Sequence, residues 1–249
     1  MDNNISKTEL LYTKSKPLDH LTIFDGIMLM IEQQAQAVTD VKKAHKQIEN
    51  AINKIVKQLT VNQNSRLIYV GAGTSGRIGV QDGVELFPTF NWPEERLDFI
   101  IAGGKKALLN AVENAEDNIY NAKKIVNDKT INSKDIIIGL AASGNTPFTC
   151  KVLEECFNRG ALTIAISNNP KGKLLNYGKI KITLDTKEEI IAGSTRLKAG
   201  TAQKICLNII SSMVMTKLGR VRNGYMNAMV PTNRKLRKRQ EFIQNKLLK

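Results

Sequence analysis

Polar and apolar residues alternate along this chain in two patterns, and the change between them falls near residue 60. Between Phe24 and Leu59 apolar side chains recur every three or four positions, as they do on amphipathic helices. We expect helix through most of residues 1–60, with Thr39-Asp40 marking the start of a second helix. Beyond residue 60 short apolar runs take over, each followed by small or polar residues.

These short apolar runs have the length and composition of strands. They occupy residues 66–70, 97–102, 135–140, 162–166 and 179–184. Stretches with helical spacing separate most of them, at residues 106–127, 146–159 and 199–218. Apolar runs that alternate with helices predict βαβ units around a buried parallel sheet. The last run alternates polar with apolar residues, which favours an edge strand.

The order of these elements predicts an α/β fold. We expect three layers, α-β-α, around a mostly parallel five-stranded sheet, preceded by N-terminal helices. The 249 residues are enough for one such domain with a small helical addition. We place an N-terminal helical region at residues 1–58, the α/β domain at 59–222 and a basic helical tail at 223–249.

Charge narrows the choice of partners. Lys and Arg number 37 against 23 Asp and Glu, a net charge of +14, which suits anionic partners. The lysines are scattered and aromatic residues make up only 5%, so we expect no nucleic-acid partner. The basic run at residues 234–239 is typical of a solvated helix face.

Cysteine content and hydropathy bear on the compartment. The three cysteines include no CxxC pair, so we expect neither a disulfide framework nor a bound metal. The opening Met1-Asp2-Asn3-Asn4 is polar and no apolar run reaches the ~18 residues of a membrane span. We expect a cytoplasmic protein without a membrane partner.

Three loops rich in Gly, Ser and Thr occupy residues 71–76, 142–147 and 193–201. Glycine lets backbone N–H groups approach an anion, hydroxyls add donors, and the helix behind each loop adds positive charge. Because the carboxyl ends of parallel strands meet at one edge of a sheet, these loops predict a phosphate site there. The binding residues that we expect are Gly73, Thr74, Ser75, Ser143, Gly144, Asn145, Thr146, Ser194, Thr195 and Lys198.

The first loop also matches GxGxxG, so a dinucleotide site is the alternative. That fingerprint expects an acidic residue where the second strand ends. Here the second run ends Ile101-Ala102-Gly103-Gly104, without a carboxylate. Hydroxyls in three separate loops therefore favour a sugar phosphate over a dinucleotide. The chain contains no GxxxxGK[ST] motif for ATP, and we expect no cofactor.

Catalytic proton transfer in this chain would fall to carboxylates. Only His20 and His45 are present, both in the predicted N-terminal helices, which disfavours a Ser-His-Asp mechanism. Carboxylates near the predicted strand ends occur at residues 82–89 and 111–117. In the second group Glu113 and Glu116 would share one face of the predicted helix 106–127. Spacing alone does not choose among them.

Several stretches, taken in order from about residue 8 to 240, are shared with one known family. They are residues 8–10, 66–80, 85 with 88–90, 101–104, 111–117, 141–144 with 146–147, 193–204, 223–230 and 233–236. With these motifs the chain closely resembles the N-acetylmuramic acid 6-phosphate etherases, members of the sugar isomerase (SIS) domain superfamily.

The resemblance implies a reaction. Such enzymes cleave the lactyl ether of N-acetylmuramic acid 6-phosphate to D-lactate and N-acetylglucosamine 6-phosphate during amino-sugar catabolism and cell-wall recycling. A base removes the proton at C2, an acid protonates the departing ether oxygen, and water adds at C3. The family's acid falls on Glu85 and its second catalytic glutamate on Glu116. The resemblance also implies a homodimer with sites near the subunit interface.

The chain departs from the family pattern at several positions. Gly83-Val84 and Leu86-Phe87 replace the usual neighbours of Glu85, Asn145 replaces an arginine, and Lys187-Glu188 replaces a Gly-Pro pair. We also expect the family's small C-terminal helical domain to be absent. Two alternatives stay open: a non-catalytic, sugar-phosphate-binding regulatory SIS protein and a sugar-phosphate isomerase. Retention of both glutamates favours the lyase.

Overall fold

The computed structural model describes residues 6–231 and 234–247, so Met1-Asp2-Asn3-Asn4 and Asn233 lie outside the described residues. A five-stranded sheet has the order β2-β1-β3-β4-β5, and every neighbouring pair is parallel. The strands are β1 Leu67–Gly71, β2 Leu97–Ile101, β3 Ile136–Ala141, β4 Leu162–Ser167 and β5 Ile180–Thr183. All the predicted strands are confirmed, and β5 lies at an edge as expected.

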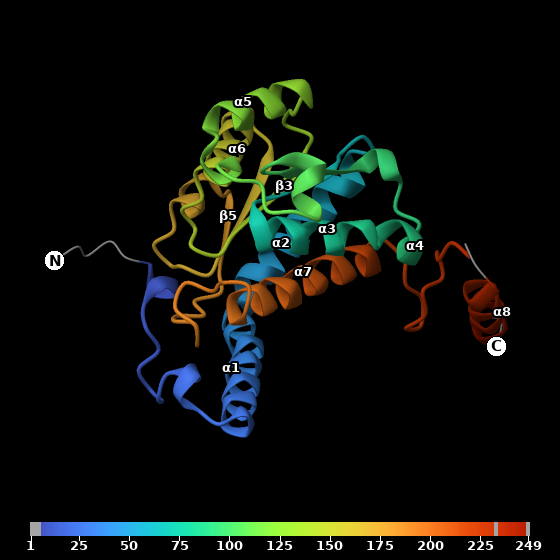
Figure 1. Cartoon of the computed structure of the whole chain (residues 1–249). Helices are drawn as coiled ribbons and strands as arrows, with labels where there is room; N and C mark the ends of the chain where they lie inside the picture. Colours follow the sequence, from blue (N-terminus) through green and yellow to red (C-terminus); the bar gives the residue numbers. More distant parts are fainter. Residues whose placement is uncertain (1–5, 232–233, 248–249) are drawn as a thin grey trace.

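Helices cover both faces of this sheet. The α-helices are α1 Ile23–Lys43, α2 His45–Val61, α3 Gly73–Val84, α4 Leu86–Phe90, α5 Ile119–Asp128, α6 Pro147–Asn158, α7 Lys198–Lys217 and α8 Arg234–Leu247. Short 3-10 helices lie at Lys7–Glu9, Leu18–His20, Glu94–Arg96, Gly104–Leu108, Ala115–Asp117 and Lys173–Tyr177. Figure 1 shows α5 and α6 above the sheet, α7 below it, and α1 projecting away from the body.

The core is divided by the sheet into two apolar layers. Ile68 and Val70 of β1 pack with α5 and α6, whereas Leu67 and Tyr69 pack with α2 and α7. This alternation follows from the two-residue period of a strand, because successive side chains point to opposite faces. Burial on both faces explains why the strands are continuously apolar. The predicted three-layer α-β-α fold is confirmed.

Two helix predictions are wrong in detail. The first is the break near Thr39-Asp40, because α1 continues to Lys43 and the chain turns at Ala44, with φ −84 and ψ 6. Asp40 caps no second helix: its side chain is buried and accepts hydrogen bonds from Gln36 and Lys43 within α1.

The second is the single helix expected at residues 106–127. Only α5, from Ile119, is α-helical there, and Glu113 and Glu116 share no helix face. Asn114 adopts a left-handed conformation with φ 55, and the side chain of Asn118 accepts a hydrogen bond from Asn121 N to cap α5. Asparagine side chains compete with helix for backbone groups, and the periodicity alone did not reveal this. The predicted helices at 146–159 and 199–218 match α6 and α7 closely.

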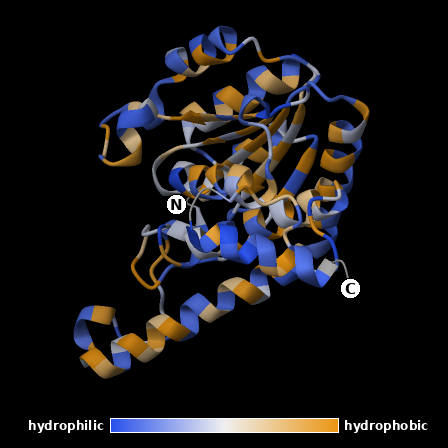
Figure 2. Ribbon diagram, turned by 90° about the vertical axis from the view of Figure 1, so that its right-hand side faces the viewer, coloured by the Kyte–Doolittle hydropathy of each residue, from blue (hydrophilic) through white to orange (hydrophobic). Residues whose placement is uncertain are grey.

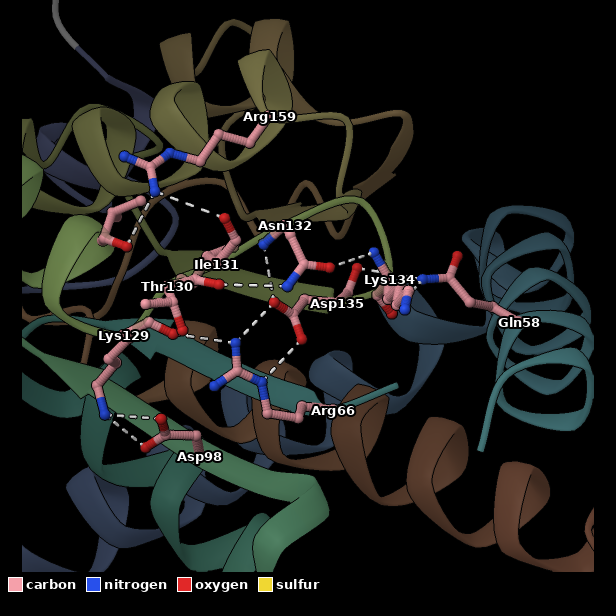
Figure 3. Close-up of polar contacts among 11 residues, drawn as sticks. Gln58, Arg66, Asp98, Lys129, Thr130, Ile131, Asn132, Lys134, Asp135 and Arg159 are labelled. Atoms are coloured by element: carbon pink, nitrogen blue, oxygen red, sulfur yellow. Dashed lines mark hydrogen bonds and ion pairs between the residues drawn. The ribbon is translucent and has the colours of Figure 1, made fainter. Parts of the chain in front are cut away.

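An ion pair joins the residues that precede the neighbouring strands β1 and β3, as Figure 3 shows. Arg66 donates from Nε and Nη2 to the two carboxylate oxygens of Asp135, at 2.8 and 2.7 Å. Arg66 Nη2 also donates to Lys129 O, and the Lys129 ammonium pairs with Asp98 at the entrance of β2. Bidentate arginine–carboxylate pairs add geometric specificity, so this cluster helps to set the register in which Leu67 faces Ile136.

A buried carboxylate, Asp82, ties α3 to β1 and α7. Its oxygens accept hydrogen bonds from Tyr69 Oη at 3.0 Å, Asn208 Nδ2 at 2.6 Å and Ser211 Oγ at 3.2 Å. Burial raises the pKa of Asp82 above its ordinary value of 3.8, although these donors act in the opposite direction. The network fixes α3, whose first residues follow the loop at the end of β1.

We expect Asp82→Ala to lower the free energy of unfolding by about 1–3 kcal/mol, because the Tyr69 hydroxyl and the Asn208 amide lose a buried partner. Asp82→Asn should cost less, since its amide oxygen still accepts and its NH₂ group can donate to Tyr69 Oη. Urea unfolding monitored by circular dichroism measures both effects. Equal losses in the two variants would contradict the role given to this network.

A comparison of wild-type protein with Asp82→Asn tests the pKa shift of Asp82. A folded-state pKa above the unfolded value means that the stability contribution is present below the unfolded pKa and is lost as pH rises through the folded pKa. Wild-type protein should therefore lose stability relative to Asp82→Asn as the pH rises from about 4. A pH-independent difference between the two proteins would contradict the shift.

Candidate active site

The loops that leave the sheet at its carboxyl edge meet where the direction of winding changes. β1 and β3 are neighbours in the sheet, yet α3 packs with α7 on one face while α6 packs with α5 on the other. In open α/β sheets this point leaves a crevice that binds ligands. A cavity of about 430 Å³ lies here.

Most of the predicted site residues line this cavity. Those from the three loops and the second glutamate are Gly73, Thr74, Ser75, Glu116, Ser143, Thr146 and Thr195. The remaining predicted residues, which do not line it, are Glu85, Gly144, Asn145, Ser194 and Lys198. These seven residues therefore lie around one cavity, and their roles in binding or catalysis stay predictions.

Hydrogen-bond donors gather at the starts of α3 and α6. The first N–H groups of a helix have no partner inside it, and the helix start carries partial positive charge. Pro147 opens α6, and the Thr146 side chain before it makes no capping bond. Within the described residues the hydroxyls of Thr74, Thr146 and Thr195 form no hydrogen bond. These donors suit an anionic group such as a phosphate.

Glu116 lines the cavity from the 3-10 helix Ala115–Asp117, and it lies beside the start of α3. Its Oε1 lies so close to Gly73 that a Cβ at Gly73 would be 2.9 Å away. Gly73 has φ +51, a conformation that side chains rarely adopt. Glycine at this position therefore serves the turn of the backbone and also leaves room for the carboxylate.

Arg77 and Glu9 also line the cavity, and neither was predicted as a site residue. Arg77 Nε and Nη2 donate to the carbonyl oxygens of Ala107 and Asn110, at 3.0 and 3.1 Å, which holds the loop after β2 against α3. Spacing offered a signal for Arg77, because it follows Gly73 by one helical turn. Glu9 lies in a separate N-terminal segment, and the signal that could have marked it was the resemblance of residues 8–10 to the family pattern.

Two residues of the second loop serve its own structure. Gly144, with φ +71, packs on a neighbouring loop so tightly that a Cβ would be 2.5 Å from Gly172 Cα. Asn145 Oδ1 accepts a hydrogen bond from Lys173 N at 3.1 Å, which turns its amide toward that loop. Gly144 and Asn145 do not line the cavity, so their predicted binding roles have no support from its geometry.

Lys198 points into a second, smaller cavity of about 210 Å³. Its buried ammonium donates to Gln33 Oε1 at 3.1 Å and to Glu188 O at 2.9 Å, and burial lowers the pKa of Lys198. The buried Glu189 carboxylate accepts from Lys198 N and Ala199 N, which caps the start of α7. These contacts give Lys198 a part in holding α1, the loop before α7 and α7 together.

Glu85 lies at the far end of α3 from the cavity and is exposed. α3 has 12 residues, and at ~1.5 Å per residue it separates Glu85 from Gly73 by about 18 Å. Glu85 and Glu116 of one chain therefore do not face a common cavity.

Among the described residues no cluster of three His, Cys, Asp or Glu side chains suits a metal ion. In the same residues we find no helix with the length and apolar character to traverse a membrane.

This sheet order and its cavity define an SIS-domain protein. Residues 47–157 match the glucokinase regulatory protein N-terminal SIS domain, and residues 109–212 match the SIS domain. The phosphoheptose isomerase from Francisella tularensis shares the fold, with a TM-score of 0.58 and 20% identity, over 79% of this chain and 100% of that one.

Closer relatives are named N-acetylmuramic acid 6-phosphate etherase. The one from Deinococcus radiodurans is 44% identical over 94% of this chain and 76% of its own length. The one from Shouchella clausii is 41% identical over 95% of this chain and 79% of its own length. The chain belongs to the N-acetylmuramic acid 6-phosphate etherase family.

We expect Gly73→Ala to reduce strongly the thermal stabilisation of the protein by N-acetylglucosamine 6-phosphate, because the methyl group would occupy cavity space beside the start of α3 and strain its first turn. Gly219→Ala is the matched control, since Gly219 has φ +77 and, among the described residues, a methyl group there would meet no atom within 4 Å. Both variants carry the backbone cost of roughly 1–2 kcal/mol. Undiminished stabilisation of Gly73→Ala by the ligand would argue against the site.

Proposed function

We propose that this protein is a carbon–oxygen lyase that cleaves the D-lactyl ether of N-acetylmuramic acid 6-phosphate. The products are D-lactate and N-acetylglucosamine 6-phosphate, and the role is in amino-sugar catabolism and cell-wall recycling in the cytoplasm. The observation that carries the proposal is family membership at 44% identity over 94% of the chain, together with a cavity that holds Glu116 among hydroxyls.

The proposed reaction is an elimination followed by hydration. A base takes the proton from C2 of the ring-opened sugar, and the electron pair left at C2 forms the double bond to C3. The C3–oxygen bond breaks, and an acid gives its proton to the departing lactate oxygen. Water then adds across the double bond, with its oxygen at C3. No redox partner is needed, so the proposal includes no cofactor.

In this proposal the starts of α3 and α6 and the hydroxyls of Thr74, Ser75, Ser143 and Thr146 bind the 6-phosphate. A phosphate there would take the place beside Gly73 that faces the Glu116 carboxylate in this structure. Glu116, displaced toward the sugar, is the base for C2. Positioned acids and bases of this kind contribute about 10²–10⁴-fold to the rate.

Glu85 is the proposed acid, and it requires a second copy of the chain. One chain leaves Glu85 exposed at the far end of α3, so the site is incomplete without another subunit. We propose a homodimer in which Glu85 of the second copy completes the site.

An unpartnered apolar surface supports assembly. α1 reaches away from the body at the lower left of Figure 2 and carries the exposed side chains of Ile23, Phe24, Ile27 and Ile31. An apolar groove continues this surface between α1, α2 and α7. Contiguous exposed apolar surface of this kind marks protein interfaces.

A non-catalytic, sugar-phosphate-binding regulator is the second candidate. The match of residues 47–157 to a glucokinase regulatory protein domain favours it. Such a protein would bind sugar phosphates without releasing D-lactate. A sugar-phosphate isomerase would instead interconvert an aldose and a ketose phosphate, and it shares with this chain only the fold.

Purified protein should release D-lactate from N-acetylmuramic acid 6-phosphate without added metal or nucleotide. Glu116→Gln should slow the release by about 10²–10⁴-fold, because the amide cannot take the C2 proton. Glu113→Gln is the control, since Glu113 is exposed and does not line the cavity. An enzyme-coupled D-lactate assay gives both rates. Wild-type protein that binds the sugar phosphate without turnover would favour the regulatory function.

Mixing inactive variants tests the contribution of a second copy. Glu85→Gln and Glu116→Gln should each be inactive alone, but a mixed dimer holds one site with both glutamates. Because half of randomly paired dimers are mixed, a one-to-one mixture unfolded and refolded together should recover about a quarter of wild-type D-lactate release. No recovery, in a sample shown by native mass spectrometry to contain mixed dimers, would place both glutamates of a site on one chain.

A further inference from the structure

A short N-terminal segment, residues 6–9, contributes Glu9 to the lining of the cavity although it lies outside the α/β domain. Ser6 and Thr8 are buried, with 9% and 0% of their surface exposed, and their hydroxyl oxygens are 2.8 Å apart. Gly193 N donates to Thr8 O at 2.9 Å. The segment is thus attached to the third loop, which carries Thr195.

Glu9 extends from this segment into the cavity. Thr8 Oγ1 donates to Glu9 Oε1 at 3.2 Å. Oε2 lies over Gly193, which has φ +74, so closely that a Cβ there would be 2.7 Å from it. Glu9 is therefore held as Glu116 is, with its carboxylate over a glycine whose positive φ and missing side chain make room for it.

The Glu9 carboxylate has no cationic partner within the part of the chain that the structure describes. There its Oε2 accepts no hydrogen bond and the carboxylate forms no ion pair. The guanidinium of Arg77, which also lines the cavity, donates to the carbonyl oxygens of Ala107 and Asn110. The Gly193 side of the cavity thus presents a hydrogen-bond acceptor with negative charge, whereas the starts of α3 and α6 present donors.

We infer that Glu9 is a specificity-determining residue that binds the uncharged part of the sugar. A carboxylate only accepts hydrogen bonds, so it selects hydroxyl or amide N–H groups and repels a second anion. The phosphate is thereby directed to the helix starts, and the ligand binds in one orientation. The nature of the sugar rests on the proposed function, but the selection of neutral donors by Glu9 does not.

The test is isothermal titration of N-acetylglucosamine 6-phosphate and of inorganic phosphate into three variants. Glu9→Ala should weaken binding of the sugar phosphate by roughly 10- to 100-fold, the range for a hydrogen bond to a charged group. Glu9→Gln should weaken it less, because the amide oxygen still accepts. Neither should weaken binding of inorganic phosphate. Glu94→Ala, at an exposed glutamate away from the cavity, is the control.

Kinetics separate binding from proton transfer. In the D-lactate assay Glu9→Ala should raise KM by at least tenfold while kcat falls by much less. Unchanged binding of the sugar phosphate by folded Glu9→Ala would overturn the inference, and so would a fall in kcat alone. If Glu9→Ala does not fold, Glu9→Gln gives the same comparison. The titrations could show the expected differences among the variants while wild-type protein releases no D-lactate. That result would refute the proposed function and leave the role of Glu9 intact.

Discussion

The site depends on the parallel pairing of β1 with β3. These strands are adjacent in the sheet but not in the chain, and their register puts Gly71 opposite Leu140. The bidentate Arg66–Asp135 pair joins the same two strands at the other edge. Because α3 and α6 then leave toward opposite faces, the loops before them open around a common space, and both helix starts face the cavity.

Two glycines shape this cavity because they have no side chain. Gly73 and Gly193 have positive φ angles, and each lies directly under a carboxylate oxygen, of Glu116 and Glu9 respectively. A methyl group at either position would collide with that oxygen. The same residue type thus provides the turn and the room for an acidic side chain. The resulting cavity has donors at the helix starts, with the Glu116 carboxylate beside the start of α3 and the Glu9 carboxylate beside Gly193.

The structure of one chain explains binding more fully than catalysis. Glu116 and Glu9 face the cavity, but Glu85 lies at the opposite end of α3, which Asp82 anchors to β1 and α7. A rigid, anchored helix does not bring both of its ends to one ligand. Assembly is therefore a part of the proposed mechanism, and the apolar surface of α1 gives it a physical basis.

The sequence alone determined the strands, most helices, the three loops and the family, because periodicity, glycine and proline act over a few neighbouring positions. It did not locate the interruption at Asn114, where side-chain hydrogen bonds compete with helix. Only the tertiary structure decided which side chains share the cavity. Glu9 lines the cavity because its N-terminal segment is hydrogen-bonded to Gly193. Lys198 does not line it, because its buried ammonium donates to acceptors in α1 and in the loop before α7. Such contacts join residues far apart in the chain, and no local pattern records them.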